Sequence, residues 1–268
     1  MDILSVTQTT EAYNFHSHTQ FCDGRDCMEN FVKAAIETGI THYGFSPHSP
    51  IPLQSPCNMQ LSDVRPYLDE VMRLRDVYGD RIHLYAAMEV DYLGPQWGPA
   101  TPYFATLGLD YKIGSVHFIP NQQGEYVDID GHFESFKNKM QQYFNNDIKY
   151  VVDTFYAQSR AMIEAGGFDI LGHFDKIGHN ASHFSPGIEQ EKWYEQHVHD
   201  LIDLIASKDI IAELNTKAWD QHHRMFPNTR YLRLIKSKGI PMIVNSDAHY
   251  PALISASRAE GLLQLADS

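Results

Sequence analysis

The amino-acid sequence predicts an α/β fold in which seven parallel strands form a barrel, with residues 1–268 as a single domain. Short apolar runs alternate with longer amphipathic stretches seven times, as expected for strands joined by crossover helices. A chain of this length closes most naturally into a barrel related to the (β/α)8 type. No internal repeat, low-complexity tract or linker divides the sequence.

The predicted strands are rich in β-branched and aromatic residues, which are enriched in β-sheets. We expect them at 13–18, 42–48, 83–92, 111–119, 168–174, 210–216 and 241–249. Amphipathic patterns predict helices at 26–38, 61–78, 150–165, 188–207, 229–237 and 253–265. Ser62 or Asp63 is expected to cap the second helix. The polar stretch 119–150 predicts a long irregular loop after the fourth strand, placed to cover the active face.

The composition narrows the classes of function. The formal net charge of −13 argues against nucleic acid or an anionic membrane as partner. Three cysteines give an odd count without a C-x-x-C pair, so we expect no disulfide framework and a cytoplasmic location. The sequence shows no signal-peptide pattern and no apolar run of the ~18 residues that a membrane span requires. It leaves the oligomeric state open.

Candidate metal ligands fall at the ends of the predicted strands. In a parallel barrel the carboxyl ends of all strands meet on one face, where active sites lie. Many buried polar side chains on one rim would be costly to leave unpaired, and bound cations remove that cost. We therefore predict a metal site from eight side chains: His16, His18, His48, Glu89, His117, His173, Asp247 and His249.

Spacing separates these residues from other histidines. His16 and His18 are two residues apart, so both point to one side of an extended strand. His42 and His83 begin strands and belong to the opposite face, where we expect structural roles. Taken alone, a strand-end residue such as His173 is more often a hydrogen-bonded core histidine. Glu89, taken alone, is equally an ordinary ion-pair partner.

The types of ligand indicate the metal. Imidazole mixed with carboxylate suits Zn, Fe or Mn better than Mg or Ca. Eight or nine ligands exceed what one tetrahedral ion uses, so we expect two to three divalent ions with Glu89 as a bridge. Such a cluster activates a water near neutral pH and holds phosphate oxygens during in-line displacement. Glu89, Asp247 and His249 are the predicted catalytic residues.

Seven motifs, in the same order, resemble those of the polymerase-and-histidinol-phosphatase (PHP) family, and within it the histidinol-phosphatases. They are FHSHTQFCDG (15–24), FSPHSP (45–50), MEVDY (88–92), IGSVHFI (113–119), ILGHFDKIG (170–178), ELNTK (213–217) and NSDAH (245–249). H-x-H alone is unspecific, whereas the ordered set spans nearly the whole chain. The resemblance implies a distorted (β/α)7 TIM-like barrel.

The resemblance also implies how the ligands divide among three ions. One ion would be held by His16, His18, Glu89 and Asp247, a second by Glu89, His117 and His173, and the third by Asp23, His48 and His249. Asp23 stands where many relatives carry a histidine, and the alternative for Asp23-Gly24 is a simple turn. The adjacent Cys22 is expected to take no part.

The activity that the resemblance implies is hydrolysis of L-histidinol phosphate to L-histidinol and phosphate in histidine biosynthesis. Arginine forks match phosphate geometry, and the family implies arginines from the regions of Arg160 and Arg224 as phosphate ligands. Weaker candidates for contact with the substrate are Lys217 and Arg258, the entrance histidines His222 and His223, and the loop carboxylates Glu125, Asp128 and Asp130.

Other functions stay open at this point. The first is hydrolysis of another small phosphate ester, and the second is a non-catalytic PHP module, which the complete ligand set disfavours. The third is a metal-dependent amidohydrolase, which also begins with H-x-H in a barrel. The sequence shows neither an eighth strand nor a strand-end lysine suited to bridge two metals. A nuclease is disfavoured by the negative net charge.

Overall fold

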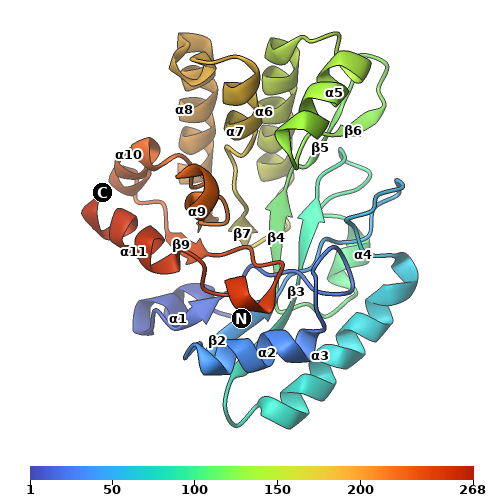
Figure 1. Cartoon of the computed structure of the whole chain (residues 1–268), viewed down its shortest axis with the longest axis vertical. Coiled ribbons are helices and arrows are strands. Elements are labelled where there is room, and N and C mark those ends of the chain that lie inside the picture. The colour runs from blue at the N-terminus through green and yellow to red at the C-terminus, as the bar shows by residue number, and fades with distance from the viewer.

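The computed structural model describes residues 1–268 and confirms the predicted α/β barrel (Figure 1). Seven parallel strands form one sheet in chain order, and a separate antiparallel hairpin, β5–β6, is inserted between β4 and β7. Helices surround the sheet. The barrel strands are β1 Tyr13–Asn14, β2 His42–Phe45, β3 His83–Asp91, β4 Tyr111–Ser115, β7 Ile170–Leu171, β8 Ile211–Asn215 and β9 Met242–Asn245.

Several strands are shorter than predicted because side chains take over part of the hydrogen bonding. The backbone N–H of Phe15 donates to Oδ1 of Asn245 (2.9 Å), and that of His173 donates to Oε2 of Glu213 (3.1 Å). These backbone groups are satisfied outside the regular ladder, as buried N–H groups must be. The chain therefore leaves regular strand geometry at the rim where the predicted ligands lie.

Two asparagines close the barrel between its first and last strands. Asn245 in β9 accepts from the backbone of Phe15, and Asn14 in β1 accepts from the N–H of Ser246 at 3.0 Å. Just beyond, a parallel bridge joins Ser17 to Ala248. The ends of β1 and β9 are thereby held together although the strands share no regular ladder.

Apolar side chains fill the amino-terminal half of the barrel. The hydroxyl of Tyr111 crosses the interior and donates to the carbonyl of Phe15 at 2.6 Å. A Cβ at position 44 would lie 1.8 Å from that hydroxyl, so only glycine in β2 leaves room for the ring. We call this apolar filling of the barrel the plug. It consists of Ile3, Tyr13, Phe15, Ala87, Tyr111, Ile113, Ile170 and Ile243.

The six predicted helices are present, with boundaries within a few residues of those expected. Neither Ser62 nor Asp63 caps the backbone as predicted, because a 3₁₀ turn (Leu61–Asp63) leads into the helix instead. Five α-helices were not predicted: α5, which lies in the segment expected to be a loop, and four short ones, in which one or two turns carry little periodic signal. The α-helices are α1 Ile3–Thr9, α2 Met28–Glu37, α3 Val64–Tyr78, α4 Pro102–Ala105, α5 Phe133–Tyr143, α6 Ile148–Ala165, α7 Ile177–Phe184, α8 Lys192–Ala206, α9 Trp219–His222, α10 Leu232–Ser237 and α11 Arg258–Asp267.

The prediction of an irregular loop at 119–150 is wrong. The segment contains the hairpin formed by β5 (Phe118–Pro120) and β6 (Tyr126–Asp128), followed by α5. Ile119, Val127 and Met140 are buried in the same apolar cluster as α6 and α8. Isolated apolar residues among polar neighbours hid this packing in the sequence. No helix in the structure is long and apolar enough to span a membrane.

Candidate metal centre

All nine predicted ligands converge at the carboxyl-terminal end of the barrel. Strand β3 illustrates how a strand brings a ligand to this end. Ala87 belongs to the apolar plug, and Glu89, two residues further on, lies on the same side of the strand at the rim. The other ligands lie in the segments that follow β1, β2, β4, β7 and β9. Six of the nine are buried, and the other three, Asp23, His48 and His249, are partly buried. The buried six are His16, His18, Glu89, His117, His173 and Asp247.

Glu89 lies at the centre of the cluster, with its two oxygen atoms facing different histidines. Oε1 lies 2.9 Å from Nε2 of His173 and 3.4 Å from Nε2 of His117. Oε2 lies 3.1 Å from Nδ1 of His48 and 3.3 Å from Nε2 of His16. A carboxylate placed between two sets of imidazoles has the geometry to bridge two cations.

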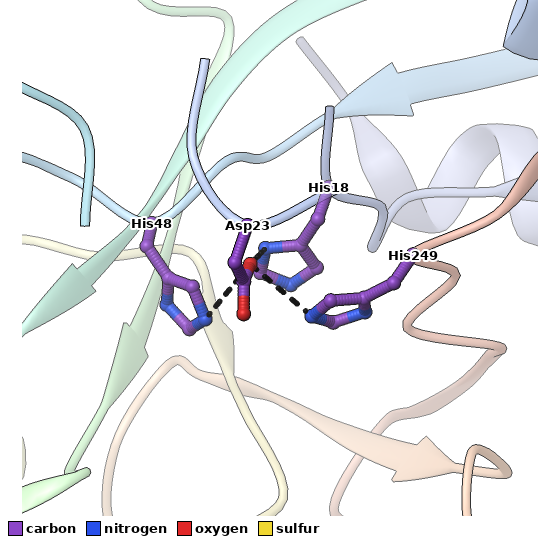
Figure 2. A group of neighbouring side chains, drawn as sticks. All are labelled: His18, Asp23, His48 and His249. Atoms are coloured by element: carbon purple, nitrogen blue, oxygen red, sulfur yellow. Dashed lines mark ion pairs between the residues drawn. The ribbon is translucent and has the colours of Figure 1, made fainter. Parts of the chain in front are cut away.

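A second group gathers around Asp23 (Figure 2). Its Oδ1 lies 3.3 Å from Nε2 of His249, 3.6 Å from Nδ1 of His18 and 3.8 Å from Nε2 of His48. The residue is also part of a turn, because the N–H of Gly24 donates to the carbonyl of Thr19. A Cβ at position 24 would lie 2.3 Å from the Thr19 nitrogen, so glycine permits the turn that brings Asp23 inward.

Asp247 closes the cluster from the last strand. Its Oδ1 lies 3.1 Å from Nε2 of His18 and 3.8 Å from Nε2 of His16. The backbone of Asp247 adopts a left-handed conformation with φ of 50°, which is uncommon outside glycine. Strained backbone of this kind persists where the surroundings impose it, and it concentrates at functional sites.

Two carboxylates behind the ligands were not predicted. Oε1 of Glu213 accepts from Nδ1 of His16 at 2.7 Å, and Oδ1 of Asp91 accepts from Nδ1 of His117 at 2.8 Å. Both bonds orient an imidazole so that its Nε2 faces the cluster, as outer-shell carboxylates do in metal sites. The signal was present in the sequence: Glu213 follows Ile211 by two positions, on the inward face of β8.

The donor set fits bound cations. Five buried atoms in the cluster have no hydrogen-bond partner: Nε2 of His16 and of His18, Nδ1 of His48, Oδ1 of Asp23 and Oε2 of Glu89. Unpaired buried polar atoms are costly, and a cation placed among them removes that cost. Four subsets have potential ligand atoms within 4.8 Å of one another: His18–Asp23–His48–His249, His16–His173–Asp247, His16–His18–Glu89 and His48–Glu89–His117.

The charges of the cluster are set by burial and by its carboxylates. Burial raises the pKa of Glu89, but the imidazoles of His16, His117 and His48 outweigh it and hold the pKa well below its usual value. Burial and the neighbouring His249 and His48 lower the pKa of His18. Ionised carboxylates beside a neutral imidazole are the protonation states that coordinate divalent cations.

Six of the nine ligands form the floor of a cavity of about 360 Å³: Asp23, His48, Glu89, His117, Asp247 and His249. The β5–β6 hairpin and the segment after it supply one wall, including Asp128 and Asp130. Lys176 lies on the wall with its Nζ 2.6 Å from Asp130, and Lys217 lies with its Nζ 3.4 Å from Asp247. The cavity therefore offers two ammonium groups beside the candidate metal ligands.

The structure does not bring the predicted phosphate-binding arginines into this cavity. Arg160 lies on α6 with Nη2 3.9 Å from Asp200 of α8, outside the lining residues. Arg224 is held by Glu189 at 2.9 Å and Asp175 at 3.1 Å and borders a neighbouring pocket. Helix phase and ion pairing decide where each of these guanidinium groups points.

The weaker candidates for contact with the substrate fall into two groups, those that line the cavity and those that do not. Lys217 and His222 line the cavity, as do Asp128 and Asp130. His223 and Glu125 do not line it. Arg258 is also excluded, because its guanidinium is buried against the Tyr13 ring and donates to the carbonyls of Val244 and Glu11.

A seven-stranded parallel barrel with a His/Asp/Glu cluster at its carboxyl-terminal rim defines the class as an α/β barrel protein with a candidate metal centre. Residues 14–217 match the PHP domain, and the chain therefore belongs to the PHP family. The resemblance predicted from the motifs is confirmed.

Two curated relatives cover almost the whole chain. "Probable histidinol-phosphatase" of Deinococcus radiodurans is 25% identical over 94% of this chain and 92% of its own. The protein of the same name from Schizosaccharomyces pombe is 26% identical over 88% of this chain and 80% of its own.

Two crystal structures share the fold. A Listeria monocytogenes protein described as a "putative histidinol phosphatase" superposes with a TM-score of 0.82 at 20% identity, over 92% of this chain and 99% of that one. Histidinol phosphate phosphatase from Lactococcus lactis, in complex with zinc, L-histidinol and phosphate, has a TM-score of 0.68 at 16% identity, over 95% of this chain and 92% of that one.

Proposed function

We propose that this protein is a metal-dependent phosphomonoesterase that hydrolyses L-histidinol phosphate to L-histidinol and phosphate. The observation that carries the proposal is the complete ligand cluster, with its unpaired buried atoms, on the floor of an open cavity. The names of both curated relatives and the ligands of the Lactococcus lactis structure supply the substrate. We propose two to three ions of Zn, Fe or Mn, because imidazole and carboxylate donors are mixed.

The ligand sets fall around Glu89 and Asp23. Glu89, His117 and His173 would hold one ion, and Asp23, His48 and His249 would hold another, with His18 within reach of the second. Divalent ions at such a site polarise phosphoryl oxygens and acidify the attacking water.

His16 and Asp247 complete the proposed set. Nε2 of His16 lies 3.3 Å from Glu89 and 3.8 Å from Asp247, so the three side chains share one space. Glu213 holds His16 in place through Nδ1. The protein's own contribution is thus to fix ligand orientation before substrate arrives.

The phosphate oxygens that face away from the ligands need further positive charge. Lys217 is the best placed residue, because its Nζ lies 3.4 Å from Asp247 and 3.3 Å from Nε2 of His249. Lys176 lies on the same cavity wall. In this proposal the two lysines take the role that the family resemblance implied for Arg160 and Arg224.

The leaving group carries an imidazole and an ammonium group. Asp128 and Asp130 supply negative charge on the hairpin wall, and Phe118 and Phe226 supply aromatic surface in the same cavity. Both oxygens of Asp128 are engaged, one by Lys139 and the other by the backbone N–H of Asp130. Asp130 is paired with Lys176 through Oδ2, which leaves its Oδ1 available. This wall is the proposed specificity element.

The three cysteines are free, which agrees with the proposed cytoplasmic location.

The test is kcat/KM for histidinol phosphate against sugar phosphates and p-nitrophenyl phosphate, with Mn²⁺ or Zn²⁺ added. We expect a preference of at least roughly 100-fold for histidinol phosphate, because unmet polar groups on the wall penalise other leaving groups. Comparable values for all esters would reject the specificity and leave a general phosphoesterase. No phosphate release from any ester by metal-loaded protein would favour a non-catalytic module.

A paired substitution tests the lysines. Lys217→Met should lower kcat/KM for every phosphate ester by roughly 10- to 100-fold while metal content stays unchanged, since a charge that stabilises the transition state is lost. Arg160→Met is the matched control, because its guanidinium lies outside the cavity. Equal losses in both variants would contradict the assignment.

A further inference from the structure

A second group of histidines lies beside the metal centre and outside its ligand set. His179 and His183 are one turn apart on α7, and His222 ends α9. The ring centroid of His179 lies 4.7 Å from that of His183 and 4.6 Å from that of His222. The ring centroids of His183 and His222 lie 6.3 Å apart. The three rings border a separate pocket of about 310 Å³.

These distances suit a shared cation. Imidazoles that share one tetrahedral zinc ion, with Zn–N bonds of about 2.0–2.1 Å, have ring centroids about 5 Å apart. Two histidines four residues apart on a helix face the same side, and the third comes from another element across the pocket. The nitrogens of the three rings do not all lie within 4.8 Å of one another, so side-chain rotation would be needed to bring one nitrogen from each ring to a common point.

The hydrogen bonding of His183 and the protonation state of His179 also suit a metal. Nδ1 of His183 donates to the carbonyl of His179 at 2.8 Å, which leaves its Nε2 free, as in the backbone contacts that orient metal-bound histidines. Burial, with His183 and His222 nearby, lowers the pKa of His179 to about 4, so its ring is neutral near neutral pH. The neighbouring cation, Arg224, is already paired with Glu189 and Asp175.

The donor chemistry separates this pocket from the proposed catalytic centre. Its lining contains four histidines and neither an aspartate nor a glutamate: His179, Ser182, His183, His222, His223, Arg224, Met225, Asn228 and Thr229. Imidazole donors without carboxylates favour Zn²⁺, Ni²⁺ or Cu²⁺ over Mg²⁺, Ca²⁺ or Mn²⁺. His179 and His222 line the larger cavity as well, so an ion held here stands at its mouth.

We propose that His179, His183 and His222 form a second transition-metal site at the mouth of the cavity, and that Zn²⁺ bound there inhibits substrate entry. The inhibitory role rests on the proposed phosphatase function, whereas the binding of zinc does not. The site is weaker than the floor cluster, because its ligands lie at the surface and no carboxylate contributes charge.

Zinc itself is the probe. Protein already loaded with its resident ions is titrated with Zn²⁺ in equilibrium dialysis, for the wild type and for His183→Ala. We expect one additional zinc equivalent in the wild type and an affinity weaker by roughly tenfold or more in the variant. His222→Ala, from the opposite element, should show the same loss. His199→Ala removes a surface histidine of α8 and should bind as the wild type does.

Kinetics test the inhibitory role separately. Without excess zinc, His183→Ala should turn over substrate at the wild-type rate, and the zinc concentration for half-inhibition should rise roughly tenfold. Wild-type zinc binding in both His183→Ala and His222→Ala would overturn the site. Lost binding with unchanged inhibition would overturn the inhibitory role. Absence of any phosphatase activity would refute the proposed function and leave the binding result standing.

Discussion

The two ends of the barrel use histidine in opposite ways. At the amino-terminal end, Nδ1 of His42 hydrogen-bonds to the Tyr85 hydroxyl at 2.8 Å, and its ring stacks on His83 with centroids 4.7 Å apart. At the carboxyl-terminal end, Nε2 of His16 and Nδ1 of His48 are buried without a partner. The positions of His42 and His83 at the beginnings of their strands predict this division.

The difference shows that position along a strand, rather than residue type, decides the role. His42 begins β2 and His48 follows its end, only six residues later. The first is partly exposed and satisfied by a protein hydroxyl, and the second faces Glu89 at 3.1 Å. Parallel strands bring all their carboxyl ends together, so only there do unpaired imidazoles accumulate.

The largest expected effect is at the centre of the cluster. Glu89→Gln should lose metal and phosphatase activity together, by roughly 100-fold or more in activity, because an amide cannot balance the charge of two cations. Elemental analysis and turnover are measured on the same preparation, with circular dichroism to show that the barrel folds. Full metal content with near wild-type turnover would contradict the bridging role.

The next effect concerns the carboxylate that orients His16. Glu213→Gln keeps the shape of the side chain but weakens its bond to Nδ1, so metal affinity should fall roughly 10- to 100-fold. Competition with a chelator of known affinity measures the loss. Added metal should restore activity in this variant and not in Glu89→Gln. A metal affinity equal to that of the wild type would show that Glu213 has only a structural role in the barrel.

A smaller effect is expected from pH, which should change the affinity of the carboxyl-terminal cluster for metal. Burial lowers the pKa of His117, but Asp91 and Glu89 raise it to about 9, so in metal-free protein the ring is protonated near neutral pH. Binding a cation through that ring releases the proton, and affinity should therefore fall as pH decreases. Calorimetry in two buffers of different protonation enthalpy measures the release. Identical heats in both buffers would contradict this account.

The smallest effect is expected at the amino-terminal end. His42→Ala removes the hydrogen bond to Tyr85 and should reduce the free energy of unfolding by about 0.5–1.5 kcal/mol. Metal content and kcat/KM should stay unchanged, because the ring lies at the far end of the strand from the cluster. Urea denaturation gives the first quantity and elemental analysis the second. A loss of bound metal would contradict the different roles assigned to histidines at the two ends of the barrel.

Much of the site was readable from the sequence because strand periodicity and strand ends are local features. H-x-H at 16–18, Glu89 and Asp247 each follow an apolar run, and the parallel topology then requires their convergence. The same alternation places Glu213 inward, two positions after Ile211, although it was not predicted. Seven strand–helix units were enough to predict the barrel, and the resemblance of seven ordered motifs indicated the PHP family.

Other features were decided only by the tertiary structure. Whether Arg160 reaches the cavity depends on helix phase and on its neighbour Asp200, and neither is encoded locally. The hairpin at 118–128 forms because Ile119 and Val127 find apolar partners on α6, from a different part of the chain. Long-range packing and ion pairing have no periodic signal in the sequence. The sequence by itself therefore determined the barrel and its candidate metal ligands, and the fold decided which charges surround them.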